Sequence, residues 1–129
     1  FSYACPLAGT MTSSFGWRED PNSGEERFHY GVDIAGEEGA SVACFADGTV
    51  TAVGESSSYG KYCTVTHANG CTTLYAHCGR ISVSSGAAVK KGEKLGEVGE
   101  TGMATGPHLH FELQKDGVYL NPIYYVETA

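Results

Sequence analysis

The chain lacks long apolar runs and carries few charged residues. Its uninterrupted apolar stretches are only a few residues long, whereas a membrane-spanning helix needs roughly 20. Charged residues make up 18% of the 129 residues and hydrophobic residues 41%, which is too little charge for a disordered chain and enough apolar surface for a core. We therefore expect no transmembrane helix and a single folded domain over residues 1–129.

Basic residues are scarce. Eight Lys and Arg stand against fifteen Asp and Glu, so the formal net charge is −7 at pH 7. This sign opposes a polyanion, and no basic stripe is available to contact phosphates. The sequence therefore predicts that nucleic acid is not a partner.

The five cysteines are too few, and odd in number, for a disulfide scaffold. At least one thiol is expected to stay unpaired or to pair outside the chain. Cys63, Cys71 and Cys78 fall on one expected hairpin, where a single cross-strand disulfide can form. Free thiols that pack as small hydrophobic groups are the alternative, and the sequence leaves both open.

Glycine is abundant, with 18 residues, and the regular stretches alternate with period two. Helices tolerate glycine poorly, whereas short strands joined by turns accommodate it. The expected strands are 42–46 and 49–53 in a hairpin around Asp47-Gly48, 62–67 and 71–78 in a hairpin around 68–70, and 108–114 before a turn. The sequence predicts an all-β fold, a compact and mostly antiparallel sheet or sandwich.

Two segments place histidines on polar strand faces. If 28–34 is one strand, His29, Gly31 and Asp33 share a face, and the small Gly31 leaves open space for an ion between the two polar side chains. A helix would also align His29 with Asp33, but glycine and the β-branched residues that follow it disfavour a helix.

The same alternation applies to the strand that begins near His108. His108, His110 and Glu112 share one face, while the apolar residues between them pack inward. On a third strand, His77 shares the face of Tyr75, which either stacks on substrate or packs in the sheet. His67 precedes a turn and is expected to be structural.

This set of residues suits zinc. Imidazole nitrogens with one carboxylate oxygen are typical zinc ligands, and a catalytic zinc keeps three protein ligands and one open position. His29, Asp33 and one or both of His108 and His110 supply such a set. The alternative is that each histidine is only a surface or hydrogen-bonded residue. Spacing alone leaves open which member of the His-x-His pair is the ligand. Glu112 either orients a ligand imidazole or is a solvated carboxylate.

The sequence closely resembles the M23 metallopeptidases, the LytM and lysostaphin-like cell-wall endopeptidases. The segments that carry the resemblance are 28–35 (FHYGVDIA), 75–77 (YAH) and 102–112 (GMATGPHLHFE). Further likeness runs nearly end to end, through 14–18, 48–50, 59–60, 89–92 and 121–122.

The resemblance implies that His29, Asp33 and His110 bind Zn²⁺ and that His77 and His108 are catalytic histidines outside the ligand set. It also implies a groove between loops that takes the substrate. The expected activity is zinc-dependent hydrolysis of peptide bonds in peptidoglycan stem peptides or cross-bridges. Such a substrate places the protein outside the cytoplasm, as a secreted or envelope domain.

Two other functions remain open from the sequence. A domain of this fold can bind cell-wall peptide or a partner protein without catalysis. A zinc amidase with the same metal ligands would cut the link between sugar and peptide instead. Zinc content measured together with turnover separates the first from an enzyme, and the released fragments separate the second.

Overall fold

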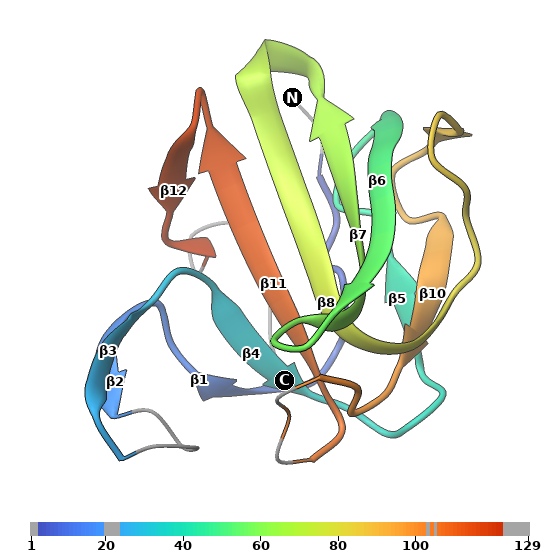
Figure 1. Cartoon of the computed structure of the whole chain (residues 1–129). Coiled ribbons are helices and arrows are strands. Elements are labelled where there is room, and N and C mark those ends of the chain that lie inside the picture. Colours follow the sequence, from blue (N-terminus) through green and yellow to red (C-terminus); the bar gives the residue numbers. More distant parts are fainter. Residues whose placement is uncertain (1–2, 20–23, 103, 105, 123–129) are drawn as a thin grey trace.

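The computed structural model describes residues 3–19, 24–102, 104 and 106–122. These residues form a ten-stranded sheet and a separate two-stranded sheet, and every strand pair in them is antiparallel (Figure 1). The strands are β1 (Thr10–Ser13), β2 (Gly16–Glu19), β3 (Glu26–His29), β4 (Val32–Ala35), β5 (Ser41–Ala43), β6 (Gly48–Ser56), β7 (Gly60–His67), β8 (Cys71–Ile81), β9 (Ala88–Val89), β10 (Lys94–Val98), β11 (His108–Lys115) and β12 (Val118–Leu120). The all-β, mostly antiparallel prediction is confirmed.

Strands β4, β11 and β8 lie side by side in the large sheet, whose main order is β1-β4-β11-β8-β7-β6-β9 (Figure 1). On β11, His110 is opposite Asp33 of β4 on one side and Ala76 of β8 on the other. The alternation predicted for β11 is confirmed, because Leu109, Phe111 and Leu113 are at most 2% exposed in the core. The register therefore places Asp33 of β4 directly beside His110 of β11.

The hairpin between β7 and β8 forms as predicted. Residues 68–70 make a single 3₁₀ turn between the two strands. Asn69 and Gly70 have φ values of 62° and 73°, which asparagine and glycine adopt more readily than other residues.

The prediction of a hairpin around Asp47-Gly48 is wrong, because β5 and β6 do not pair with each other. Strand β5 pairs with β10, and β6 pairs with β7 and β9. The turn at 90–93 takes the hydrogen bonds that a hairpin would use: the Cys44 N–H donates to Glu93 O, and its carbonyl accepts from Gly92 N–H, each at 2.8 Å. The Asp47 carboxylate also accepts from Lys91 N–H at 2.7 Å.

The prediction of a single strand over 28–34 is also wrong, because the extended segment is interrupted between β3 and β4. Strand β3 belongs to the small sheet with β2, and β4 belongs to the large sheet. Gly31 lies in the break, where a Cβ atom would collide with the carbonyl oxygen of Phe111. The space above Gly31 is therefore filled by β11 and does not hold an ion.

Cys44, Cys63, Cys71 and Cys78 are free thiols, so the β7–β8 hairpin contains no disulfide and the alternative of free thiols is correct there. On the β7–β8 hairpin, Cys63 lies opposite Tyr75 and Cys78 opposite Lys61, and neither faces another cysteine. Burial raises the pKa of both thiols to about 12. These groups are therefore almost entirely protonated near neutral pH.

We expect Cys63 and Cys78 to resist alkylation in the folded protein. At about pH 8 a thiol with a pKa near 12 has roughly a thousandfold less thiolate than an ordinary thiol, and burial excludes the reagent as well. Mass spectrometry after iodoacetamide treatment, with and without denaturant, measures this. The peptidase activity expected from the sequence should survive alkylation of the folded protein. Loss of that activity in a sample that keeps its fold and any bound metal would contradict a purely structural role for the cysteines.

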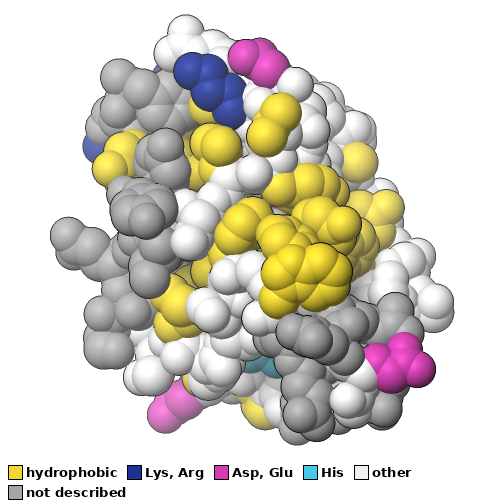
Figure 2. Space-filling model, turned by 90° about the vertical axis from the view of Figure 1, so that its left-hand side faces the viewer, with side chains coloured by type: hydrophobic (Ala, Val, Ile, Leu, Met, Phe, Trp, Pro, Cys, Tyr) yellow, Lys and Arg dark blue, Asp and Glu magenta, His cyan; other side chains and the backbone are white. Residues whose placement is uncertain are grey.

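Among the described residues, no helix has the length and apolar character that crossing a membrane requires. Hydrophobic side chains gather on the face of the molecule drawn in Figure 2, and residues of β2, β3 and β12 with Tyr30 form an aromatic surface. Phe28 contacts Trp17 and Tyr30 with ring centroids 5.5 and 5.0 Å apart, and Tyr30 contacts Tyr119 at 4.8 Å. Trp17 is 70% exposed. Because His29 separates Phe28 from Tyr30 on the chain, this aromatic surface adjoins the cluster of histidines.

Candidate metal centre and flanking histidines

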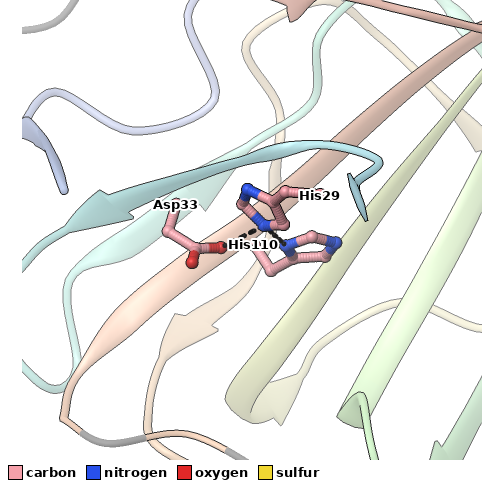
Figure 3. A group of neighbouring side chains, drawn as sticks. All are labelled: His29, Asp33 and His110. Carbon is pink, nitrogen blue, oxygen red and sulfur yellow. Dashed lines mark hydrogen bonds and ion pairs between the residues drawn. The ribbon is translucent and has the colours of Figure 1, made fainter. Parts of the chain in front are cut away.

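His29, Asp33 and His110 converge from β3, β4 and β11 (Figure 3). His29 Nε2 lies 3.2 Å from His110 Nδ1 and 3.3 Å from Asp33 Oδ1. His110 Nδ1 lies 2.8 Å from Asp33 Oδ1. These three atoms form a small triangle, although His29 and Asp33 come from two different sheets.

The triangle fits a zinc ion. Zinc binds imidazole nitrogen and carboxylate oxygen at about 2.0 to 2.2 Å, so the ligand atoms of a tetrahedral site stand about 3.3 Å apart. The observed separations of 2.8 to 3.3 Å are near that value. His108 lies farther out, with its Nε2 atom 3.8 Å from Asp33 Oδ1.

The second nitrogen of each imidazole in the triangle has a fixed partner. His29 Nδ1–H donates to the carbonyl of Ser14 at 2.9 Å, and His110 Nε2–H donates to Glu112 Oε2 at 2.8 Å. Such bonds fix the tautomer and the ring orientation of a metal ligand. The structure thus favours the orienting interpretation of Glu112.

Tyr59 extends this chain of contacts. Its hydroxyl donates to Glu112 Oε2 at 2.7 Å, and its ring stacks against His110 with centroids 5.8 Å apart. The sequence did not single out Tyr59 for this contact, because the residue precedes β7 and is far from Glu112 in the chain. No local pattern links a turn tyrosine to a carboxylate on another strand.

Asp33 and His110 stabilise each other's charged forms. Burial by itself would raise the pKa of Asp33, but the hydrogen bonds from His110 and His29 outweigh it and hold that pKa well below its usual range. Burial would lower the pKa of His110, but the carboxylates of Asp33 and Glu112 raise it to about 9. A cation bound in the triangle would take the place of the proton on His110 Nδ1.

His77 and His108 flank the triangle with their rings 4.9 Å apart. Each donates its Nδ1–H to a main-chain carbonyl, His77 to Thr101 at 2.8 Å and His108 to Gly106 at 2.9 Å. Each Nε2 is then an unprotonated acceptor in the neutral ring. Burial lowers the pKa of His77, which keeps this ring neutral at pH 7.

His77 reaches the site through an irregularity that strand alternation does not predict. Tyr75 is fully buried, and its hydroxyl bonds Thr73 at 2.6 Å and Phe45 N–H at 3.0 Å. Tyr75 therefore packs in the sheet, which is one of the two roles expected for it, and the expectation that it shares a face with His77 is wrong. His77 has φ 61°, and the β7–β8 register shifts between Lys61 and Cys63. This bulge turns His77 out of the alternation and toward His108.

The fifth histidine, His67, lies outside this site. Its Nε2 is 2.7 Å from the Thr73 hydroxyl, and its Nδ1–H donates to the Asp47 carbonyl at 3.0 Å. Both contacts belong to a buried polar network that contains none of the triangle residues. This arrangement agrees with the structural role expected for His67.

The chain is similar in sequence to peptidases of one family. Residues 27–122 match the model of peptidase family M23. The DD-carboxypeptidase/endopeptidase Mpg of Neisseria meningitidis serogroup B is 44% identical over 119 residues, which cover 92% of this chain and 27% of that protein. The chain belongs to peptidase family M23, a family of metallopeptidases.

Two solved structures share the fold. A zinc-containing peptidase from Vibrio cholerae superposes with a TM-score of 0.87 and 33% identity, over 94% of this chain and 39% of that one. The catalytic domain of a variant of the prophage-encoded M23 protein EnpA from Enterococcus faecalis gives a TM-score of 0.80 and 32% identity, over 93% of this chain and 95% of that one.

The chain spans about a quarter of the length of the Neisseria relative, at 27%. The single domain expected over residues 1–129 stays a prediction, as does the substrate groove between loops. The metallopeptidase class agrees with the His/Asp/His cluster, because the matched residues 27–122 include all three members of that cluster.

Proposed function

We propose that this domain is a zinc-dependent endopeptidase that hydrolyses peptide bonds in the stem peptides or cross-bridges of peptidoglycan. The observation that carries the proposal is the triangle of His29, Asp33 and His110 with two further histidines beside it. The relatives of the chain support this class of substrate. They include the DD-carboxypeptidase/endopeptidase Mpg of Neisseria and the peptidoglycan DD-endopeptidase ShyC of Vibrio cholerae.

In this proposal His29, Asp33 and His110 hold Zn²⁺, and Glu112 with Tyr59 behind it keeps His110 oriented. Bound zinc supplies an activated water, whose pKa falls toward about 7, and polarises the carbonyl of the scissile amide. The ionised Asp33 offsets part of the charge of the cation. The triangle therefore provides both the donor set and the charge that zinc requires.

His77 and His108 transfer protons and stabilise charge. Their Nδ1–H groups are held by the carbonyls of Thr101 and Gly106, so each Nε2 is the atom that meets the substrate. A neutral Nε2 accepts the proton of the attacking water, and the protonated ring then donates to the leaving amine or to the negative charge on the carbonyl oxygen. Burial lowers the pKa of His77, so its ring is neutral before the reaction and Nε2 is available to accept a proton.

Digestion of purified peptidoglycan by the zinc-loaded domain tests the activity. We expect mass spectrometry to show new amine and carboxyl ends within stem peptides or cross-bridges, with the bond between sugar and peptide intact. Release of whole stem peptides from the sugar would assign the domain as an amidase. Retention on peptidoglycan without any product from the zinc-loaded protein would assign it as a binding module.

The proposed substrate also sets the proposed location. Peptidoglycan lies outside the cytoplasmic membrane, so we propose that the domain acts after export, as a secreted or envelope protein. Its net charge of −7 opposes binding to a polyanion, so we propose no nucleic-acid partner.

A further inference from the structure

Thr101 makes two side-chain hydrogen bonds that the proposed mechanism does not use. Its hydroxyl donates to the carbonyl of Cys78 at 2.6 Å and accepts from Lys61 N–H at 2.9 Å. Its own carbonyl accepts from His77 Nδ1–H at 2.8 Å. One residue of the loop before β11 therefore joins the start of β7, the bulge of β8 and the ring of His77.

From these contacts we infer that Thr101 is a positioning residue, which holds the His77 ring in the orientation and tautomer that the reaction needs. The inference rests on the proposed function of His77. The side chain of Thr101 acts through its own main chain: the two hydroxyl bonds fix the peptide unit, and the carbonyl of that unit fixes His77 Nδ1–H.

His77 needs such support because its backbone is strained. It has φ 61°, a left-handed conformation that is unfavourable for a residue other than glycine. Its N–H donates to the carbonyl of Tyr59 at 2.7 Å, which anchors the main chain but leaves the ring free to rotate. The hydrogen bond from the ring to the Thr101 carbonyl opposes this rotation, and the ring also contacts the rings of His108 and His110.

The loop that carries Thr101 is packed too closely to shift without rearrangement. A Cβ atom on Gly60 would collide with the main chain and the hydroxyl of Thr101, and a Cβ on Gly102 would collide with the main chain of Gly60. Both glycines have positive φ, 65° and 76°. Thr101 is therefore enclosed on both sides, and its carbonyl has a defined position.

Thr101→Val tests this role with little change of shape. Valine keeps the branched volume but offers neither the donor to Cys78 nor the acceptor for Lys61. In the zinc-loaded domain we expect kcat on a cell-wall peptide to fall about 10- to 100-fold, because a displaced catalytic group loses its alignment. KM and zinc content should stay near the wild-type values, and Thr101→Ser, which keeps the hydroxyl, should recover most of kcat.

A double-mutant cycle with His77→Ala separates positioning from a general structural effect. If Thr101 acts only through His77, adding Thr101→Val to His77→Ala should leave kcat unchanged. Additive losses, a Thr101→Ser variant as slow as Thr101→Val, or unchanged kcat in a folded Thr101→Val would each overturn the inference.

A measurement without turnover keeps the inference testable if the domain does not cleave peptidoglycan. Nitrogen NMR of the zinc-loaded wild type should show His77 as the Nδ1–H tautomer, and Thr101→Val should shift it toward a mixture, whereas His108 should not change. A wild-type protein that lacks activity but shows this shift contradicts the proposed function alone. An unchanged His77 signal in Thr101→Val contradicts the positioning role.

Discussion

His110→Ala is expected to lose zinc and with it nearly all turnover. The substitution removes His110 Nδ1, one of the three proposed ligand atoms. This atom lies 2.8 Å from Asp33 Oδ1 and 3.2 Å from His29 Nε2. Loss of a residue that only orients a ligand weakens metal binding by about 10- to 100-fold, so loss of a ligand should exceed that. His29→Ala and Asp33→Ala should behave in the same way. Elemental analysis of dialysed protein measures the effect.

His108→Ala is the matched control, because it removes the other histidine of the His-x-His pair from the same strand. It should keep its zinc. If His110→Ala retained full zinc while His108→Ala contained none, the assignment within the pair would be reversed. A folding control comes from circular dichroism, because the core side of β11 is unchanged in both variants.

His77→Ala and His108→Ala are each expected to keep zinc and fold but to lose turnover by roughly 10² to 10⁴. Removing a proton-transfer partner leaves the metal in place and affects the transition state. The loss should therefore appear mainly in kcat. Steady-state kinetics on a cell-wall peptide, with zinc measured on the same samples, gives both quantities.

His67→Gln serves as the control for this second prediction, since His67 contacts the buried network of Thr73 and Asp47 instead of the metal centre. Its kcat should stay close to the wild-type value. A kcat near the wild-type value in His77→Ala or in His108→Ala would remove that histidine from the mechanism. Near wild-type values in both would mean that zinc alone drives hydrolysis.

Strand alternation predicts much of this site where the strand is regular. On β11 the apolar residues Leu109, Phe111 and Leu113 enter the core, so the side chains of His110 and Glu112 must lie together on the opposite face. Their 2.8 Å hydrogen bond follows from that parity. A single sequence can predict such a pair because both members belong to one extended segment.

Alternation fails where the backbone leaves the regular path. His77 has φ 61°, and the residues that force this bulge, Tyr59 and Thr101, belong to other segments of the chain. The same holds at Gly31, where the main chain of β11 fills the expected open space and separates β3 from β4. Contacts between distant segments decide both places, and the local pattern does not contain them.

Resemblance to a family supplied what spacing left open. Residue spacing allowed either His108 or His110 as the ligand, and the structure places His110 Nδ1 in the triangle, with His108 Nε2 3.8 Å from Asp33. The supporting contacts of Tyr59 and Thr101 could not be predicted from the chain, because each joins a turn or loop to a distant strand.

The position of the zinc ion is the decisive measurement for the proposed metal centre. Crystals of the domain grown with zinc should be measured at the zinc absorption edge, where an anomalous difference map locates the ion without assumptions about ligands. We expect one strong peak at about 2.0 to 2.2 Å from His29 Nε2, Asp33 Oδ1 and His110 Nδ1, with His77 and His108 beyond bonding distance. A peak bound by His108 in place of His110, or no peak among these three residues at full zinc loading, would contradict it.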